Sequence, residues 1–478
     1  MSNHTICLLN DSFPPLIDGV ANVVVNYGRI IEQKHGHSIV VTPDVPGADD
    51  SGYNFPVIRY PSIDTRSIAM GYVTGYPFSP EAAHRIKEEK TELLHTHCPI
   101  VSSLLARQLA ESMELPLILT WHTKYDIDIA NAVRSKILQE AAIQALLRNV
   151  NACNEVWTVS KGAGENLRSL GYEGDYIVMP NGVDMPHGRL NEDKVHEATA
   201  GYDLPKGVPV FLFIGRVMWY KGLRIILDAL AKLMNKDIDF RMVFIGGGGD
   251  EIEVKDYSSK LGLDNKVIFT GALSNRDKLR AWYARADLFL FPSTFDTNGL
   301  VVREAAASNT ASIIIRNSCA SEGVSDGRNG FLIDENAESL SSKLSELIRF
   351  PERIHSVGLN AGRDIYISWE ESVARAYDRY ETVLDRYKSG YYEKRLPYDY
   401  DFFRAQGELM EILGNMDIVR NGLVKSAHNL KDGIDSSLEP LRNIKNEAEH
   451  LFQNKKEEAL EGLDTVRKDI WETLERYL

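Results

Sequence analysis

Short runs of β-branched and other apolar residues alternate with segments of helical periodicity through residues 1–390. Such an alternation is typical of parallel sheets whose strands are joined by covering helices. The series begins with the runs Thr5–Leu9, Ser38–Thr42, Leu117–Thr120 and Glu155–Ser160, most of them followed by polar residues. Because the carboxyl ends of parallel strands meet at one edge of a sheet, we expect ligands to bind there.

The same pattern restarts after a turn-rich stretch that begins at Pro180. The later apolar runs are Val208–Ile214, Arg241–Ile245, Lys266–Thr270, Leu288–Phe291 and Ser312–Ile315. A chain of 478 residues exceeds one ordinary core, so we predict two successive α/β domains, 1–190 and 191–368. The helical segment 369–390 follows them and is expected to pack on one of the two.

The character of the chain changes from about Pro397. No strand pattern remains, and apolar residues recur at helical spacing over residues 397–478. We therefore predict a separate extension of amphipathic helices that serves as an accessory bundle or as a homodimerisation element. A membrane-surface role is the alternative, but such helices usually carry Lys and Arg on their polar face, whereas this segment is acidic.

Composition narrows the class of protein further. The formal net charge of −14 argues against a general nucleic-acid binder, because such proteins neutralise phosphates with Lys and Arg. No stretch approaches the ~20 apolar residues that span a bilayer, and the N-terminus lacks the basic flank and apolar core of a secretory signal. The four cysteines lie far apart, so we expect a reducing compartment, the cytoplasm, and no disulfide framework.

The most informative segment runs from Phe291 to Ala305, from the end of a strand into a helix predicted to begin near Asn298. Its first free amides suit an anion, and they belong to Thr297, Asn298, Gly299 and Leu300. Asp296 and Glu304 lie eight residues apart, which on a helix is up to roughly 12 Å. That separation suits two groups of one extended ligand better than a shared proton. The alternative is a capping Asp and a solvated Glu.

A second segment places two cations after another strand. Arg216 and Lys221 are five residues apart and follow the strand that ends at Gly215. Directed at a diphosphate, each would contribute on the order of 1.5–3 kcal/mol through charge-assisted hydrogen bonds. The alternative is a solvated Arg and a Lys at a helix start.

Two further segments belong to the first domain. Gly19 lies where a helix begins and would offer backbone amides to a phosphate, although the glycine fingerprint of dinucleotide-binding proteins is absent. His122 follows the strand Leu117–Thr120 and would hydrogen-bond a ligand hydroxyl or act structurally. His95 and His97 lie close in sequence to Cys98, but no fourth ligand has suitable spacing, so we predict no metal site.

Together these segments resemble the retaining GT-B glycosyltransferases usually called glycosyltransferase family four. The resemblance covers nearly all of residues 1–390, and the order and spacing of its motifs carry it. Those motifs are the Pro-Pro-x-x-x-Gly-Val loop, His95-Thr-His97, Trp121-His-Thr-Lys-Tyr125, Pro180-Asn-Gly-Val-Asp184, Gly215-Arg-Val-Met-Trp-Tyr-Lys-Gly222 and the Asp296 to Glu304 segment.

The resemblance implies two Rossmann-like domains facing a cleft, with helix 369–390 crossing back onto the first. It implies a hexosyltransferase that moves a sugar from a nucleoside diphosphate to an acceptor hydroxyl with retained anomeric configuration. It implies neither a metal nor a cofactor besides the nucleotide sugar. Uridine diphosphate sugars are the default donor because they are common in the group, not because any residue requires uracil.

The resemblance also assigns the donor-binding residues. Arg216 and Lys221 would hold the diphosphate, helped by backbone amides near Gly19 and from Asn298 to Leu300. Glu304 would accept hydrogen bonds from the ribose hydroxyls.

Three residues are implied at the reacting sugar. His122 would lie beside it, and Tyr125 would lie on the acceptor side. Asp296 stands where the family most often has Glu and would contact the donor sugar. One methylene less shortens its reach by roughly 1.5 Å, which makes the choice of donor sugar the weakest part of the analogy.

The acceptor is left open between a membrane lipid such as diacylglycerol and a glycan or small soluble molecule. Segment Asn131–Val150 carries Arg134, Lys136 and Arg148 beside apolar residues, so it is expected either to face the core or to dock on the inner face of the membrane.

A different class of function is a catalytically weak GT-B scaffold whose helical tail binds a partner protein. Retention of Arg216, Lys221 and Glu304 argues against it.

Overall fold

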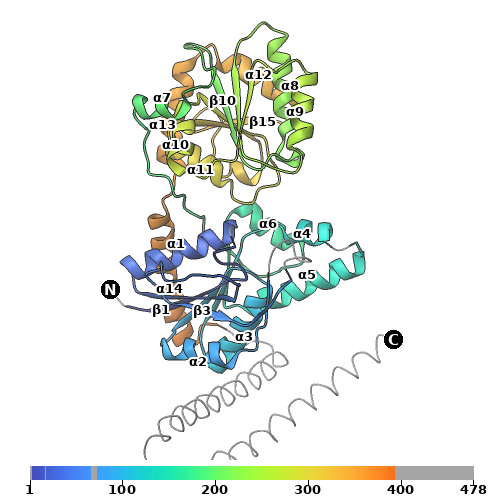
Figure 1. Ribbon diagram of the computed structural model, residues 1–478. Coiled ribbons are helices and arrows are strands. Elements are labelled where there is room, and N and C mark those ends of the chain that lie inside the picture. The colour runs from blue at the N-terminus through green and yellow to red at the C-terminus, as the bar shows by residue number, and fades with distance from the viewer. Residues whose placement is uncertain (1–2, 17, 66–72, 133, 393–478) are drawn as a thin grey trace, which may run out of the picture. The chain divides into compact units, whose positions relative to one another are not determined.

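The computed structural model describes residues 3–16, 18–65, 73–132 and 134–392 (Figure 1). The helical extension predicted for residues 397–478 lies outside these residues. Within them the chain forms two compact units. The first comprises the stretches up to Trp157, Leu170–Ile177 and the residues from Ala376, and the second comprises Thr158–Ser169 and Val178–Arg375.

The first sheet has seven strands in the order β3-β2-β1-β6-β7-β8-β9. They are β1 (Thr5–Leu9), β2 (His37–Pro43), β3 (Val57–Tyr60), β6 (Leu93–Thr96), β7 (Leu117–Trp121), β8 (Glu155–Thr158) and β9 (Ile177–Val178). The pairs from β3 through β7 run parallel. Two short strands, β4 (Ser62–Ile63) and β5 (Thr74–Gly75), form a separate antiparallel pair. The carboxyl ends of β1, β6 and β7 therefore share one edge of the sheet.

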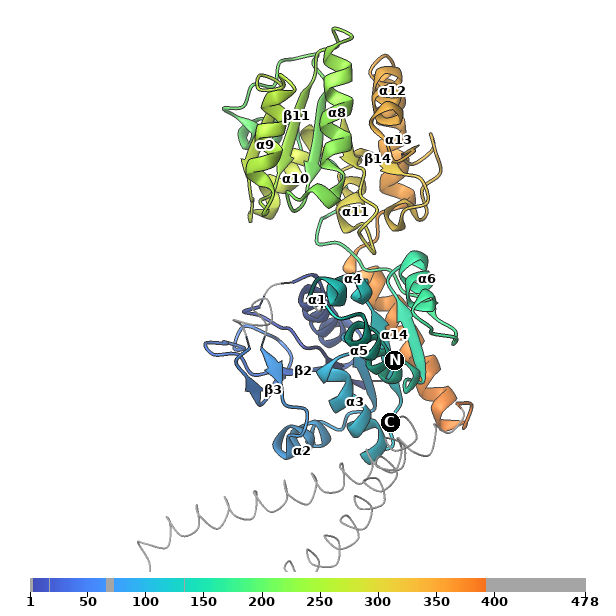
Figure 2. The same ribbon diagram turned by 90° about the vertical axis from the view of Figure 1, so that its right-hand side faces the viewer.

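Helices connect the strands of the first sheet, as the alternation predicted (Figure 2). They are α1 (Gly19–Lys34), α2 (Pro80–Glu88), α3 (Val101–Ser112), α4 (Tyr125–Ala132) and α5 (Lys136–Asn151). Helix α1 begins at Gly19 because the carboxylate of Asp18 accepts a hydrogen bond from the amide of Ala21, 2.7 Å away. The strands are buried almost throughout, which explains their continuous apolar runs.

The second sheet has six strands in the order β12-β11-β10-β13-β14-β15, paired in parallel. They are β10 (Val210–Ile214), β11 (Arg241–Ile245), β12 (Val267–Gly271), β13 (Leu288–Phe291), β14 (Ala311–Ile315) and β15 (Phe331–Ile333). The chain moves outward from β10 toward β12, then returns to the centre and moves out through β13. Neighbours β10 and β13 therefore mark the point where the strand order reverses, the usual place for a ligand in such sheets.

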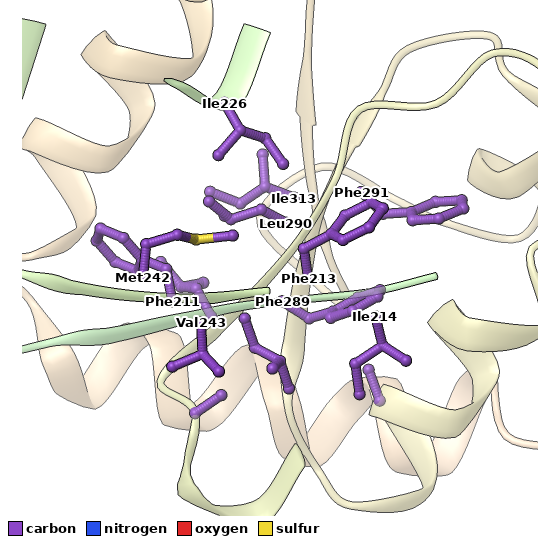
Figure 3. Close-up of a cluster of buried hydrophobic side chains, with 14 of the residues drawn as sticks. Phe211, Phe213, Ile214, Ile226, Met242, Val243, Phe289, Leu290, Phe291 and Ile313 are labelled. Atoms are coloured by element: carbon purple, nitrogen blue, oxygen red, sulfur yellow. The ribbon is translucent and has the colours of Figure 1, made fainter. Parts of the chain in front are cut away.

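Helices cover both faces of the second sheet. Helices α8 (Leu223–Met234), α9 (Glu251–Lys260) and α12 (Ala337–Leu347) form one group, and α7 (Glu192–Thr199), α10 (Arg276–Arg285), α11 (Leu300–Ala307) and α13 (Pro351–Asp364) form the other (Figure 1). Between the layers lies a core of aromatic and aliphatic side chains that includes Phe211, Phe213 and Phe289 (Figure 3). The core fixes the strands whose ends carry the site.

Two helices tie distant segments of the chain together. The N-terminus of α6 (Lys161–Ser169) is capped by Glu322, whose carboxylate accepts from the amides of Lys161 and Gly162 at 2.7 and 2.6 Å. Helix α14 (Trp369–Lys388) begins in the second unit and continues in the first. There the hydroxyl of Tyr377 accepts a hydrogen bond from the amide of His4. Among the described residues, none of the helices has both the length and the apolar character required to cross a membrane.

Candidate active site

Lys221 and Asp296 form the centre of the site in the second unit. Lys221 lies in a short 3-10 helix (Trp219–Lys221) after β10, and Asp296 lies in the loop after β13. The Nζ atom of Lys221 lies 2.6 Å from Oδ1 of Asp296, and Ser293 donates to the other carboxylate oxygen at 2.6 Å. Lys221 is only 7% exposed. The pair thus fixes a cation and an anion where the strand order reverses.

A glycine lets the two loops touch. Gly222 follows Lys221 and has a φ of 77°, in the left-handed region. A Cβ atom at this position would come within 1.9 Å of the carbonyl oxygen of Pro292, at the start of the second loop. A larger residue would therefore separate the loops and move Lys221 away from Asp296.

Arg216 supplies a second cation in the same loop. Its side chain is exposed, and its guanidinium lies 5.9 Å from the centre of the Tyr220 ring. It has no ion-pair partner among the residues that the structure describes. A backbone hydrogen bond anchors this loop, because the amide of Val217 donates to the carbonyl oxygen of Gly247 with an N···O distance of 3.0 Å. The site therefore contains one paired cation and one that is available to a phosphate.

The start of α11 follows directly on the loop that holds Asp296. The sequence predicted this helix to begin near Asn298, whereas it begins at Leu300, because Gly299 adopts a left-handed φ of 58° as its cap. The carbonyl of Thr297 accepts a hydrogen bond from Ser160 of the α6 segment. Both polar atoms of the Asn298 side chain are buried and make no hydrogen bond to any described residue. The turn thus places a carboxamide and a helix N-terminus beside the Lys221–Asp296 pair.

Glu304 lies deeper in α11 and is almost fully buried. Tyr283 donates its hydroxyl to Oε2 at 3.0 Å, and Arg276 lies 3.1 Å from Oε1. Burial raises the pKa of Glu304, and the charge of Arg276 and the hydrogen bond from Tyr283 oppose that shift. Sequence reasoning missed Arg276 and Tyr283. Their signal was the spacing of seven residues, which puts both on one face of α10.

In the first unit, taken by itself, Gly19 lies at the start of α1. The position is exposed, and a Cβ built on Gly19 would meet nothing within 4 Å. The helix start is therefore open to a ligand. Asp11, in the same post-strand segment, has a structural role instead, since its carboxylate accepts from the amides of Val101 and Ser102 and caps α3.

Three histidines lie at the carboxyl ends of β6 and β7. His95 hydrogen-bonds Tyr380 through Nδ1 at 2.6 Å and Thr120 through Nε2 at 2.7 Å. His97 contacts His122, with 3.0 Å between Nδ1 and Nε2. Burial lowers the pKa of His122 to about 3 and also lowers the pKa values of the other two. All three rings are therefore uncharged at neutral pH.

No cluster of three or more His, Cys, Asp or Glu side chains suited to a metal ion occurs among the residues described. Tyr125, placed on the acceptor side by the resemblance, is buried at the start of α4. Its hydroxyl donates to Sγ of Cys98 at 3.7 Å. The hydroxyl of Tyr125 therefore points into the interior of the first unit.

The sequence of α5 allowed either a core-facing helix or a membrane-docking helix, and the two ends of α5 differ in burial. Leu146, Leu147 and Val150 near its C-terminal end are buried. Ile137 and Leu138 in its first turn are 77% and 60% exposed. The expectation of a core-facing helix therefore holds for the last turns and fails for the first ones.

Two family models match the chain. The model described as Glycosyltransferase Family 4 matches residues 17–186, and the model described as Glycosyl transferases group 1 matches residues 196–363. The alpha-monoglucosyldiacylglycerol synthase of Streptococcus pneumoniae is 23% identical over 380 residues, with 74% of this chain and 86% of the relative covered. The protein of the same name from Acholeplasma laidlawii is 24% identical, with 74% and 91% covered.

Solved structures share the fold. Sucrose-phosphate synthase from Thermosynechococcus elongatus superposes with a TM-score of 0.65 at 18% identity, with 80% of this chain and 100% of that chain covered. Anabaena HepE in complex with UDP gives a TM-score of 0.63 at 16% identity, with 79% and 100% covered. The protein is thus a glycosyltransferase with the GT-B fold. It belongs to the family that joins a Family 4 domain to a group 1 domain, as its motifs predicted.

Proposed function

We propose that this protein transfers a sugar from a nucleoside diphosphate sugar, by default a uridine diphosphate sugar, to a hydroxyl group of a membrane lipid, with retention of anomeric configuration. The observation that carries the proposal is the pairing of Lys221 with Asp296 in the same loop region as the exposed cation of Arg216, which has no ion-pair partner among the described residues, at the reversal point of the second sheet. The names of the two diacylglycerol-glycosylating relatives support a lipid acceptor.

The diphosphate is the leaving group, and its growing negative charge is what the site must stabilise. Lys221 supplies a positive charge held in place by Asp296, Arg216 supplies a second, exposed one, and the start of α11 adds backbone amides. These groups take the role that a divalent cation plays in other transferases, so we propose a reaction without metal or further cofactor. Glu304, deep in the same helix, would accept hydrogen bonds from the ribose hydroxyls.

The hydrogen bonds of the Asp296 carboxylate support transfer with retention of the anomeric configuration. One carboxylate oxygen is engaged by Lys221 and the other by Ser293. A carboxylate held in this way is a weak nucleophile, which disfavours a covalent glycosyl intermediate on Asp296. We therefore propose that the acceptor hydroxyl attacks from the face that the diphosphate leaves, and that the departing phosphate oxygen takes up its proton.

The first turns of α5 are the proposed contact with the lipid. Ile137 and Leu138 expose large apolar side chains, and Arg134, Lys136 and Arg148 are exposed on or near the same helix. Apolar residues bordered by cations suit the surface of an anionic membrane. The four free thiols fit the reducing cytoplasmic side of that membrane.

The test is a donor panel with and without lipid. Purified protein receives UDP-glucose, UDP-galactose, UDP-N-acetylglucosamine or GDP-mannose, and the release of nucleoside diphosphate is followed with and without anionic vesicles that contain diacylglycerol. We expect release from one donor, stimulated by vesicles, and a glycolipid product. Silence from all four donors together with clear nucleotide binding would favour a scaffold role instead.

A matched pair of variants separates catalysis from docking. The double substitution Ile137→Asp and Leu138→Asp should abolish stimulation by vesicles and leave slow hydrolysis of the donor unchanged. Ile252→Asp is the control, because Ile252 is 76% exposed on α9 of the second unit. Equal stimulation of all three proteins would show that α5 does not dock on lipid.

A further inference from the structure

Asn298 carries a carboxamide that the fold leaves without hydrogen bonds. The residue lies two positions after Asp296 and directly before the glycine that caps α11. It is half-buried as a whole, yet both polar atoms of its side chain are buried and make no hydrogen bond to any described residue. A buried polar group in this state has lost its hydrogen bonds to water and gained none within the protein. The carboxamide of Asn298 therefore does not stabilise the fold.

The backbone on either side of Asn298 is held in place. The carbonyl oxygen of Thr297 accepts a hydrogen bond from the hydroxyl of Ser160. A Cβ atom built on Gly299 would come within 2.9 Å of the Cα atom of Ala320, so the cap of α11 packs directly on the short 3-10 helix that follows β14 (Cys319–Ser321). Both contacts oppose a movement of the whole turn. Rotation of the side chain is therefore the simpler way for the carboxamide to reach a partner.

Such a rotation breaks no hydrogen bond, because the carboxamide makes none to the described residues. The Cα atoms of Asn298 and Asp296, two residues apart, are separated by at most about 7 Å. The carboxylate of Asp296 is bound to Lys221 and is itself partly exposed. A ligand that contacts Asp296 therefore lies within reach of the Asn298 side chain once that side chain has turned.

The chemistry of a carboxamide narrows the class of ligand. Its Nδ2 atom donates two hydrogen bonds and its Oδ1 atom accepts them. The oxygens of a diphosphate only accept, so a diphosphate would satisfy the donor end alone, and Lys221 and Arg216 already offer it positive charge. Hydroxyl groups both donate and accept. Two neighbouring hydroxyls of a sugar therefore match both ends of the Asn298 side chain.

We propose that Asn298 is a specificity-determining residue for the transferred sugar, and that its carboxamide turns out of its buried position when the donor binds and hydrogen-bonds to hydroxyl groups of that sugar. The inference rests on the proposed function, because it requires a sugar next to Asp296. It adds the side chain of Asn298 to the backbone amides at the start of α11 as a group that contacts the donor.

The first measurement is thermal unfolding, which is independent of activity. Leucine has nearly the shape of asparagine without its polar atoms, and the φ of Asn298 lies outside the left-handed region, so the backbone accepts Asn298→Leu. We expect the full-length variant to melt about 2–4 °C higher than the unmodified protein, because the unsatisfied carboxamide is gone. A lower melting temperature would show that the carboxamide has partners in the folded state, such as a bound water, and would overturn the proposal.

Asn329 provides a matched control in the same unit. It is almost fully buried, but its Oδ1 atom accepts from the amide of Ser325 at 2.7 Å and its Nδ2 atom donates to the carbonyl of Gly323 at 3.1 Å. Asn329→Leu should therefore lower the melting temperature. An increase in both variants would show that leucine stabilises this unit for another reason, and would overturn the inference that the Asn298 carboxamide lacks partners.

Binding and turnover then test the assignment to the sugar. With the donor that the panel identifies, Asn298→Leu should lower kcat/KM by about tenfold, the usual effect of losing one or two neutral hydrogen bonds. The Kd of the matching nucleoside diphosphate without its sugar should stay the same. A higher Kd for that nucleotide would assign the carboxamide to the nucleotide and overturn the proposal, and so would an unchanged kcat/KM.

Donors that each lack one sugar hydroxyl show whether the contact is direct. In the unmodified protein, removal of the recognised hydroxyl should lower kcat/KM by about tenfold, whereas in Asn298→Leu the same removal should have little further effect. Equal losses in both proteins for every hydroxyl would show that Asn298 contacts none of them. Absence of transfer by the unmodified protein would overturn the proposed function together with this inference, whereas a lower melting temperature of Asn298→Leu would overturn this inference alone.

Discussion

Lys221 and Asp296 hold each other across the loops that follow β10 and β13, with 2.6 Å between Nζ and Oδ1. A free lysine side chain loses about 2 kcal/mol of rotamer entropy when it is ordered. In this structure that cost is met during folding, because the carboxylate already fixes the ammonium group. A diphosphate that arrives at the site therefore finds an ordered cation.

Replacing Lys221 tests whether this cation serves catalysis. Lys221→Ala should lower turnover on the order of 100- to 1000-fold, since a preorganised charge is lost. The free energy of unfolding should fall by only about 1–3 kcal/mol. Turnover and urea denaturation measure the two effects. Lys232→Ala is the control, because Lys232 forms a surface ion pair with Glu338 at 2.8 Å. Unchanged turnover of Lys221→Ala would contradict the assignment.

The length of Asp296 is expected to influence the choice of donor sugar. Asp296→Glu restores the longer carboxylate typical of the family and should move it relative to Lys221 and Ser293. We expect the ratio of kcat/KM between two donor sugars to change by about tenfold, which corresponds to about 1.4 kcal/mol. Asp296→Asn should lower kcat for all donors, because it removes the charge without changing the shape. Identical ratios in the Glu variant would show that side-chain length is not the determinant.

Glu304 is expected to act on nucleotide affinity. Glu304→Gln should raise the Kd for nucleoside diphosphate roughly 10- to 100-fold, because a hydrogen bond to a charged group contributes about 1.5–3 kcal/mol. Tyr283→Phe should weaken binding less, since Arg276 still holds the carboxylate. Calorimetric titration measures both. The control is Tyr257→Phe, which removes a hydroxyl bonded to Asp228 on another helix and should leave affinity unchanged.

The buried histidines predict how stability depends on pH. The folded state lowers the pKa values of His95, His97 and His122, whereas histidine in an unfolded chain titrates near 6.5. Below about pH 6.5 the unfolded state therefore binds more protons, and the free energy of unfolding should fall by up to about 4 kcal/mol per pH unit. Stability is fully present above that pH. Urea unfolding between about pH 7.5 and about pH 5 measures the slope.

A single variant tests whether the histidines cause this pH dependence of the free energy of unfolding. His97→Asn removes one of the three groups, so the slope should be smaller by about 1.4 kcal/mol per pH unit. A free energy of unfolding that does not change over this range would show that the rings are protonated in the folded state. An equal slope in the variant would assign the effect to other groups.

Much of the fold could be predicted because the central strands are buried. The runs Thr5–Leu9, Arg241–Ile245 and Leu288–Phe291 coincide with β1, β11 and β13. A strand covered on both faces needs a continuous apolar run, and such a run is visible without tertiary information. The polar residues after these strands also lie where expected, since the carboxyl edge follows from the parallel pairing.

The partners of the site residues could not be predicted in this way. Tyr283 reaches Glu304 from another helix, and His97 reaches His122 from another strand. Local spacing does not show which helix packs on which, so these contacts appear only in the folded chain. Helix α5 shows the same limit, because its periodicity does not say at which turn it leaves the core.

The capping of α6 by Glu322 limits how this protein can be recombined with its relatives. The chain passes between its two units at Trp157/Thr158, Ser169/Leu170, Ile177/Val178 and Arg375/Ala376. No single crossover in the gene therefore yields an intact unit from each parent. A chimera that imports Val178–Arg375 from a relative must import Thr158–Ser169 from the same relative. Otherwise the residue at the position of Glu322 would come from one parent and the start of α6, which Glu322 caps, from the other.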